Sequence, residues 1–396
     1  MESQHQQGIG KEEFDLLIKQ VREIGKSVIS PMASDVDSKA RFPKEGIDAL
    51  KELKLLSAYV PAELSGMGLN ITQLAKICET LGEYCGSTAM VFAMHQVLVA
   101  CLVHHSTKDE YFREYMKELV DGQRLIASAT SEIGTSGDLR SSICAVQVDG
   151  ERFTLNKAAP VISYGQDADD LMVTCRRSED ASAADQLHVL LKKGDFELEH
   201  TSSWDTMGFR GTCSDGYKVT SSGSTQQIFP EPFSEILSES MHPSAHILWG
   251  SLWVGIATDA VNKARGYVRS AARRNPEGAQ ISALRLAEVA TTLQEMRNNM
   301  YVSVQGYQEI LTAGDSDAIN NFGFAIHTNN LKLSCSELMV DIVGRSLLIC
   351  GLSGYRNDSE HSLSRHIRDS YGAALMVNND RIRGHNATML TVHREA

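Results

Sequence analysis

The sequence predicts a mainly α-helical fold with a β-domain in the middle of the chain. Apolar residues recur at helical spacing up to about residue 122, alternate with polar residues between about 123 and 235, and then return to helical spacing. The 396 residues correspond to about two to three domains, each able to bury a core. We therefore expect an N-terminal helical domain at 1–122, a central β-domain at 123–235 and a C-terminal helical domain at 236–396.

The N-terminal third contains several amphipathic segments. From Phe14 to Val28 apolar residues form one stripe with a period of three to four residues, which predicts a helix. The residues between the later segments include Gly68, Asn70 and the pair Gly86-Ser87, which are types that end or cap helices. The further helices predicted on this basis lie at 43–56, 71–84, 88–105 and 107–122.

The middle third has the period of two that is typical of strands. Residues 144–148 and 153–155 alternate between apolar and polar types, and Asp149-Gly150 between them predicts a hairpin turn. Further strands are predicted at 169–177, 186–193 and 195–200. The loops are rich in Ser, Gly and Asp, so this third is predicted to be a β-domain with polar loops.

The C-terminal part predicts a four-helix bundle. Three segments of more than twenty residues are apolar on a broad face, at 245–274, 281–311 and 329–350. The sequence "TAGDSD" at 312–317 is expected to stop one helix and cap the next. A shorter helix after "RHIRDS" at 365–370 would complete the bundle.

Composition excludes several classes of function. With 42% hydrophobic and 22% charged residues the chain is globular, and its net charge of −12 argues against nucleic acid and anionic membranes as partners. The apolar run at 87–103 is interrupted by His95 and Gln96 and is short for a membrane span. No targeting segment is recognisable at the N-terminus, and the eight cysteines are scattered singly, so we expect a cytoplasmic protein with reduced thiols.

One stretch, "ASATSEIGTSGDLRSS" at 127–142, indicates a ligand site. It crowds hydroxyl side chains and glycines between the helical third and the first predicted hairpin, and such residues offer hydrogen bonds and allow a ligand to approach the backbone. Nucleotide-binding glycine motifs and the G-x-S-x-G motif are absent. His242 and His246 are four residues apart, but Pro243 lies between them and no third ligand is near, so no metal site is expected.

Two further stretches have two interpretations each. The segment 203–216 contains Asp205 and Arg210, which either belong to a ligand loop or form an ion pair that stabilises the loop. The segment 349–370 combines glycines with Arg365 and Arg368, which either hold a pyrophosphate or form a turn between helices with a surface ion pair.

The order of five short segments resembles the acyl-CoA dehydrogenase superfamily over nearly the whole chain. These are "SEIGTSGD" at 131–138, "NKAAPVISYG" at 156–165, "WDTMGFRGT" at 204–212, "GLSGY" at 351–355 and "RHIRD" at 365–369. The resemblance implies an N-terminal helical domain, a central β-barrel-like domain and a C-terminal four-helix bundle. It also implies FAD between the β-domain and the bundle of a homo-oligomer, a dimer or a tetramer.

The resemblance also assigns residues to the cofactor. Facing the flavin ring it places Ser128, Thr130 and Ser131, with Gly137 at the pyrophosphate and Ser163 beside the reactive nitrogen. Here Ile133 replaces the usual Pro, and Val161 replaces a frequent aromatic residue. The residues assigned to contacts from a neighbouring subunit are Arg269 and Gln280, and those at the adenine end are Gly351, Leu352, Asn379 and Arg381.

The position of the usual catalytic base holds no carboxylate. Oxidation of an acyl thioester needs a base for the α-proton, and relatives supply a Glu at the position of Val377 or, less often, near Ala245. Both positions are apolar here. His246, beside the second position, and His95, on a helix that lines the acyl pocket in relatives, are the candidate bases.

Three functions remain open at this point. The first is a dehydrogenase that oxidises an acyl or aminoacyl thioester on CoA or a carrier protein and passes electrons to an electron-transferring flavoprotein. The second is a flavin-dependent oxidase or monooxygenase that uses oxygen. The third is a non-catalytic flavin or thioester binder on the same fold.

Overall fold

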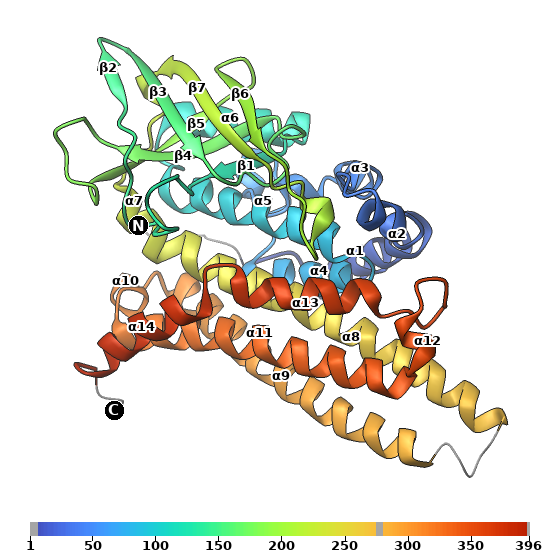
Figure 1. Ribbon diagram of the computed structural model, residues 1–396. Helices are drawn as coiled ribbons and strands as arrows, with labels where there is room; N and C mark the ends of the chain where they lie inside the picture. The colour runs from blue at the N-terminus through green and yellow to red at the C-terminus, as the bar shows by residue number, and fades with distance from the viewer. Residues whose placement is uncertain (1–6, 275–279, 394–396) are drawn as a thin grey trace.

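The computed structural model describes residues 7–274 and 280–393, and its elements follow the predicted order of helices, strands and helices (Figure 1). The predicted N-terminal helices are present. A π-helical turn, Gly25–Ile29, joins the first two of them. The helices of this part are α1 (Lys11–Ile24), α2 (Ser30–Ser38), α3 (Lys44–Glu52), α4 (Ile71–Gly82), α5 (Gly86–His105) and α6 (Glu110–Gly122).

Helix α5 is the central helix of the N-terminal part. It is apolar on all sides, and 94% of its most apolar window is buried inside the protein, although its length and composition would allow it to cross a membrane. Such an all-round apolar helix is typical of a protein core. Helix α4, which packs beside it, begins with a capping box: the Asn70 side chain accepts a hydrogen bond from the Gln73 amide, and the Gln73 side chain accepts one from the Asn70 amide.

The β-domain consists of two sheets. One has the order β1-β4-β5, with β1 and β4 parallel, and the other has the antiparallel order β2-β3-β7-β6. The predicted hairpin at Asp149-Gly150 is present, with Asp149 opposite Arg152. The strands are β1 (Ile126–Ala129), β2 (Gln147–Asp149), β3 (Arg152–Ala159), β4 (Asp170–Arg176), β5 (Gln186–Leu191), β6 (Phe196–Ser202) and β7 (Gly216–Ser224).

Two of these strands were not predicted. Strand β1 is only four residues long and opens the hydroxyl-rich stretch, so its strand character is masked by the loop that follows. Strand β7 does alternate between buried and less buried residues, but several of its buried positions are Gly or Ser rather than apolar. Strand β7 nevertheless pairs along all of β3 and holds the larger sheet together.

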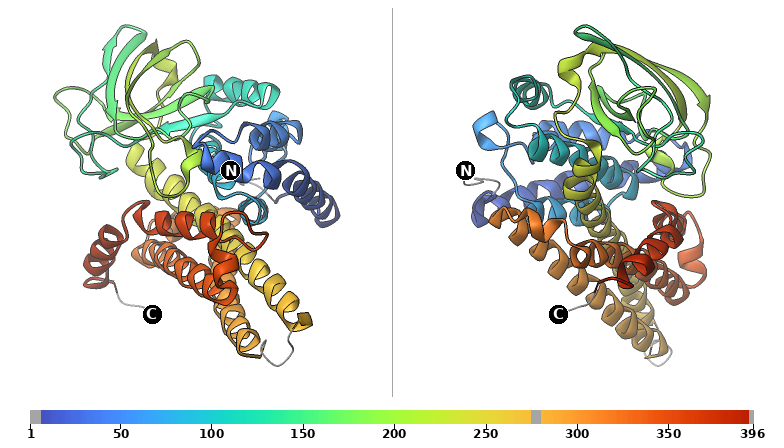
Figure 2. Two further views of the ribbon diagram at one scale, coloured as in Figure 1. Left: turned by 45° about the vertical axis from the view of Figure 1, so that its right-hand side comes forward. Right: turned by 90° about the vertical axis from the view of Figure 1, so that its left-hand side faces the viewer.

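The C-terminal part is the predicted four-helix bundle, formed by α8, α9, α11 and α13, and it extends away from the β-domain (Figure 2). Helix α13 contains the "RHIRDS" segment instead of following it, and α14 was not predicted. The elements are α7 (Phe233–Ile236), a π-helical turn (Leu237–Met241), α8 (His242–Arg274), α9 (Gln280–Ala313), α10 (Ser316–Ile319), α11 (Phe322–Cys350), α12 (Leu352–Tyr355), α13 (Ser364–Leu375) and α14 (Asn379–Leu390).

The segment around 204–212 connects the three parts of the fold. The buried Asp369 of α13 accepts a hydrogen bond of 2.6 Å from the Phe209 amide, and burial raises the pKa of Asp369 to about 6. Neighbouring Arg368 donates to Asp37 of α2 at 2.8 Å. Gly208 is required here, because a Cβ would lie 2.2 Å from the Arg368 carbonyl oxygen.

The two open interpretations of this region can now be judged. Asp205 is 92% exposed and lies 3.6 Å from Arg210, whose guanidinium donates to the Asp37 and Thr206 carbonyls instead. Arg365 donates to the carbonyl of Tyr84 in the loop before α5. These two arginines therefore fix the packing between the parts of the chain.

Candidate flavin and substrate site

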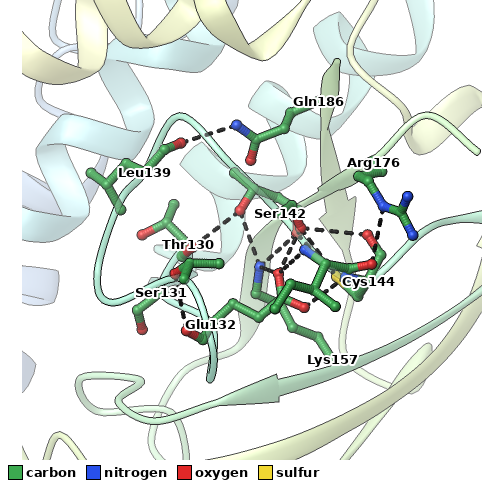
Figure 3. A network of polar contacts seen from close by, with 12 residues as sticks. Thr130, Ser131, Glu132, Leu139, Ser142, Cys144, Lys157, Arg176 and Gln186 are labelled. Carbon is green, nitrogen blue, oxygen red and sulfur yellow. Dashed lines mark hydrogen bonds and ion pairs between the residues drawn. The ribbon is translucent and has the colours of Figure 1, made fainter. Parts of the chain in front are cut away.

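The hydroxyl-rich loop after β1 is folded around one buried carboxylate (Figure 3). Glu132 accepts hydrogen bonds from the Ser142 hydroxyl at 2.6 Å and from the amides of Ile143 at 3.0 Å and Cys144 at 2.7 Å. The Lys157 ammonium of β3 lies 3.4 Å from the same carboxylate. The side chains of Glu132 and Lys157 are 5% and 0% exposed, so both ends of the loop are held to the interior of the β-domain.

Electrostatics keeps Glu132 ionised. Burial opposes ionisation, but the charge of Lys157 and the donated hydrogen bonds outweigh it and lower the pKa of Glu132 below its ordinary value. Lys157 also donates to the Thr174 carbonyl oxygen at 2.7 Å, and the Thr174 hydroxyl donates to the Thr130 carbonyl oxygen at 3.2 Å. These contacts join the smaller sheet to the larger one beneath the loop.

We call the hydroxyl residues assigned to the flavin, Ser128, Thr130, Ser131 and Ser163, the flavin platform. Ser128 donates to the Thr130 hydroxyl at 3.3 Å, and Ser131 donates to the Val161 carbonyl at 3.0 Å. The hydroxyl of Ser163 is 2.8 Å from that of Ser214. All four assigned side chains are half-buried, so the loop presents hydrogen-bonding groups in a fixed arrangement.

The turn that contains Gly137 is contacted by an arginine of α14. Gly137 has a φ of +75°, and the Arg381 guanidinium donates to the carbonyl oxygens of Ser136 and Gly137. Arg140 lies in the same region, 3.3 Å from the ring of His385. Within the described residues, neither Arg381 nor Arg140 has a carboxylate ion-pair partner. Such donors suit a pyrophosphate, so this part of the site fits a flavin dinucleotide.

The other assigned cofactor residues are far from this platform in the same chain. Arg269 and Gln280 belong to the ends of α8 and α9, and Gly351 and Leu352 lie at the turn into α12, at the end of the bundle away from the β-domain (Figure 1). Leu352 is 72% exposed. Contacts of these residues with a flavin therefore require a second copy of the chain.

A cavity of about 430 Å³ lies between the loop at 137–140 and the bundle. The segment 233–242, the start of α11 and the turn into α14 form the rest of its wall. Its lining is mostly apolar, with Leu139, Phe233, Phe324 and Val377 among the apolar members. A concave, mostly apolar space beside a polar loop is typical of a small-molecule site.

The turn at Val377 is held from below by a buried lysine. Lys332 of α11 donates to the Val377 carbonyl oxygen at 3.2 Å and to the Asn379 side-chain oxygen at 2.6 Å. Lys332 is 0% exposed and has no carboxylate partner among the described residues. Burial therefore lowers its pKa to about 8. Val377 itself has a φ of +45°, a conformation that strains a β-branched residue. Asn379 is thereby fixed at the start of α14, and no carboxylate occupies the turn.

The two histidines proposed from the sequence have different environments. His95 is fully buried: its Nε2 donates to the Leu56 carbonyl oxygen at 2.7 Å and its Nδ1 accepts from the Ile126 amide at 3.1 Å. Both ring nitrogens are thus used to tie α5 to β1, and burial lowers its pKa to about 4. His246 donates through Nδ1 to the Thr328 carbonyl oxygen at 3.2 Å, while its Nε2 is buried without a partner.

Sequence reasoning considered His242 only as a metal ligand. It lines the cavity, and its Nε2 lies 3.0 Å from the side-chain oxygen of Asn329. Its ring is 4.1 Å from that of His246. Across 7–274 and 280–393, no three His, Cys, Asp or Glu side chains are grouped as metal ligands. Two histidines line the cavity, His242 and His385, and neither the motif order nor the spacing predicted them as bases.

Comparison with known families agrees with this arrangement. The model of the acyl-CoA dehydrogenase N-terminal domain matches residues 11–123, and that of the acyl-CoA dehydrogenase C-terminal domain matches residues 245–376. The chain belongs to the acyl-CoA dehydrogenase superfamily. It is an acyl-CoA dehydrogenase-like flavoprotein oxidoreductase.

Relatives within the superfamily have different activities. The chain is 23% identical over 381 residues to cyclohex-1-ene-1-carbonyl-CoA dehydrogenase of Geobacter metallireducens, covering 91% of this chain and 92% of that relative. The prolyl acyl carrier protein oxidase AnaB superposes with a TM-score of 0.80 at 18% identity, covering 96% and 100% of the two chains. The dibenzothiophene monooxygenase TdsC of Paenibacillus sp. A11-2 superposes with a TM-score of 0.80 at 17% identity, covering 96% and 98%. These likenesses show the fold and leave substrate and electron acceptor open.

The buried pair beneath the flavin loop gives the first prediction. Glu132→Gln leaves the Lys157 ammonium buried without a carboxylate, so we expect a loss of about 3–5 kcal/mol in the free energy of unfolding. The stabilisation by Glu132 is present above its unfolded pKa of about 4.3 and is lost as the pH falls through the lower folded value. Chemical denaturation at pH 7 and pH 4 measures both effects. Glu151→Gln, at an exposed position, is the control. Equal free energies of unfolding for the two variants would contradict the prediction.

The buried lysine beneath Val377 gives a second prediction. Because the folded pKa of Lys332 is about 8 and the unfolded value about 10.4, the unfolded chain binds more protons between these pH values. We therefore expect the wild-type protein to gain stability relative to Lys332→Met as the pH rises from 8 to 10. Thermal unfolding at several pH values measures this difference, with Lys218→Met on the exposed surface as control. A difference that stays constant with pH would contradict the assignment.

Proposed function

We propose that the protein is an FAD-dependent oxidoreductase that oxidises an acyl or aminoacyl thioester carried on CoA or on a carrier protein. The observation that carries this proposal is the 430 Å³ apolar cavity that opens between the flavin loop and the bundle. The cavity is lined by residues 137–140 of the hydroxyl-rich loop, so a substrate chain in this space would lie beside that loop. The low net charge expected of an acyl chain suits the apolar lining, and the arginines near Gly137 suit a phosphate.

The choice of FAD rests on the donors at the turn of Gly137. A dinucleotide carries a pyrophosphate, which the resemblance places at Gly137, and the Arg381 guanidinium, which the resemblance assigned to the adenine end, contacts this turn. The distal end of the bundle, with Arg269, Gln280 and Leu352, would complete the site from another copy. We therefore propose a homo-oligomer, a dimer or a tetramer, located in the cytoplasm.

The chain's own residues have three tasks in such a reaction. When bound, the flavin supplies a hydride acceptor. The half-buried hydroxyls of Ser128, Thr130 and Ser163 orient it, and the apolar wall around Val377 excludes water from the reacting carbons. The Lys332 contact fixes the Val377 turn at the wall of the cavity.

A second candidate is an oxidase or monooxygenase that passes electrons to oxygen instead of to an electron-transferring flavoprotein. The observation in its favour is the absence of a carboxylate at Val377 and Ala245, the two places where the usual dehydrogenase base is expected. Among the structural neighbours, one is named a carrier-protein oxidase and another a monooxygenase. A non-catalytic flavin or thioester binder is the third outcome of the test below.

Anaerobic titration of the FAD-loaded protein tests these functions. We expect one class of thioester, added as butyryl-CoA, hexanoyl-CoA or a prolyl-loaded carrier protein, to bleach the flavin absorption bands. Reoxidation is then followed separately with oxygen and with an electron-transferring flavoprotein, because rapid reoxidation by oxygen alone identifies the oxidase class. Binding of thioester without bleaching would support the binder, and no response to any probe would overturn the proposal.

The arginine at the Gly137 turn gives a prediction for the cofactor. Removing a charged donor costs about 1.5–3 kcal/mol, so Arg381→Ala is expected to raise the dissociation constant for FAD by roughly 10- to 100-fold. Fluorescence titration of the apoprotein measures this constant. Arg383→Ala is a matched control, since Arg383 is only two residues away but pairs with Glu337 and Asp380. An unchanged constant in Arg381→Ala would remove the pyrophosphate assignment.

A further inference from the structure

We propose that His242 is the catalytic base of this protein and that its Nδ1 removes the α-proton of the thioester. The inference rests on the proposed function, because it names the base for that reaction. His242 opens α8 at the wall of the cavity, and Val377, at the position of the missing carboxylate, lines the same cavity. The structure thus places an imidazole in the space from which the usual carboxylate is absent.

A chain of side-chain amides fixes the proton on this imidazole. Asn386 donates through Nδ2 to the Asn330 side-chain oxygen at 2.9 Å, and the Asn386 oxygen accepts from Nδ2 of Asn329 at 2.8 Å. The free oxygen of Asn329 therefore faces His242 and can only accept a hydrogen bond. In the neutral ring the proton must then lie on Nε2, 3.0 Å from that oxygen.

This tautomer leaves the other ring nitrogen as the acceptor. No hydrogen bond to His242 Nδ1 occurs within the described residues, and unlike Nε2 of His246 it is not a fully buried atom. Asn329 and Asn386 are each only 6% exposed, so the amide chain holds the ring without competition from bulk water. An imidazole with one nitrogen anchored by a neutral amide and the other facing the ligand space has the geometry required of a general base.

The other side chains with a nitrogen that could act as a base are hydrogen-bonded or buried. Both ring nitrogens of His95 are bonded to backbone groups, and His246 has its unpartnered nitrogen sealed in the core. Lys332 is completely buried and donates to the Val377 turn. His385 lines the cavity together with His242, but its Nδ1 is in contact with the Arg140 guanidinium at 3.3 Å.

The step balances with the flavin as oxidant. The Cα–H bond breaks and its proton moves to His242 Nδ1, while the electron pair of that bond forms the Cα=Cβ double bond. The Cβ–H bond breaks at the same time, and its hydrogen leaves with both electrons to the flavin. The thioester loses two hydrogens, and the imidazole later returns its proton to solvent through the cavity mouth near Arg140 and His385.

Two measurements on the holoenzyme test this assignment. The first is the rate of anaerobic flavin bleaching by the thioester that reduces the wild-type protein. The second is the uptake of deuterium from D₂O at Cα of phenylacetyl-CoA, which has an acidified α-proton but no β-hydrogen and therefore reports proton removal without oxidation. His242→Gln is expected to slow both by roughly 100- to 10,000-fold. His200→Gln on the exposed edge strand β6 is the matched control and should change neither.

A gain of function separates a catalytic role from a structural one. In His242→Ala, the added change Val377→Glu returns a carboxylate to the cavity wall and is expected to restore a large part of both rates, and added imidazole should restore part of them in the single variant. Flavin content and thermal unfolding of each variant show that it is folded. Equal rates in His242→Gln and wild type, or loss without rescue in a folded variant, would overturn the assignment of the base.

The same experiment distinguishes this inference from the proposed function. If the wild-type protein is reduced by a thioester while His242→Gln is reduced equally fast, the function stands and the base is wrong. If the wild type exchanges the α-proton but no thioester reduces it, and His242→Gln abolishes exchange, the base is right and the oxidation is wrong. If the wild type does neither, both are overturned.

Discussion

The flavin platform depends on one buried ion pair. The loop at 130–144 buries no apolar side chain, with Ile133 and Ile143 more than half exposed, so the hydrophobic effect alone cannot hold it in place. Instead the Glu132 carboxylate accepts hydrogen bonds from two backbone amides and a hydroxyl and forms an ion pair with the Lys157 ammonium. These contacts hold the end of the loop against its beginning. A buried carboxylate is costly unless its hydrogen bonds are satisfied, and here each of these groups also gains a partner that the loop would otherwise lack. These buried polar contacts therefore hold the loop in place.

The opposite wall of the site is organised by cations and amides. Lys332 holds the turn at Val377, Arg381 reaches across to the loop carbonyls, and Asn329 anchors His242. A carboxylate at 377, as in the usual dehydrogenase, would lie close to these positive charges and be held ionised. With Val at this place, no carboxylate stands at position 377, and proton removal falls to a neutral group. The missing carboxylate therefore distinguishes this wall from that of a dehydrogenase with the usual Glu.

The sequence predicted the architecture better than the site. Helical and alternating periods identify the three parts because each period reports directly which face is buried, and the failures occur where buried positions are Ser or Gly, as in β7, or where a short helix such as α14 follows a strained turn. The hydroxyl loop was recognisable from its composition, whereas the resemblance assigned Arg381 to the adenine end instead of the Gly137 turn that it contacts. His242 was not recognisable, because its role depends on Asn329, which lies 87 residues from it, and on Asn386, which lies a further 57 residues along the chain. Such contacts between distant helices leave no local pattern in one sequence.

Local charge decides how an acidic chain can receive an anionic substrate. The net charge of −12 repels a phosphate at long range, but at physiological ionic strength exposed charges act over only about 8 Å. Arg140 and Arg381 line the cavity and have no carboxylate ion-pair partner among the described residues, whereas Arg383 pairs with Glu337 and Asp380. These arginines attract an anionic group, and the acyl group of the substrate would contact the neutral His242 imidazole and the apolar side chains of the cavity. With Arg381 assigned to the flavin, the phosphate of a thioester would lie at Arg140 and its acyl group against the apolar wall.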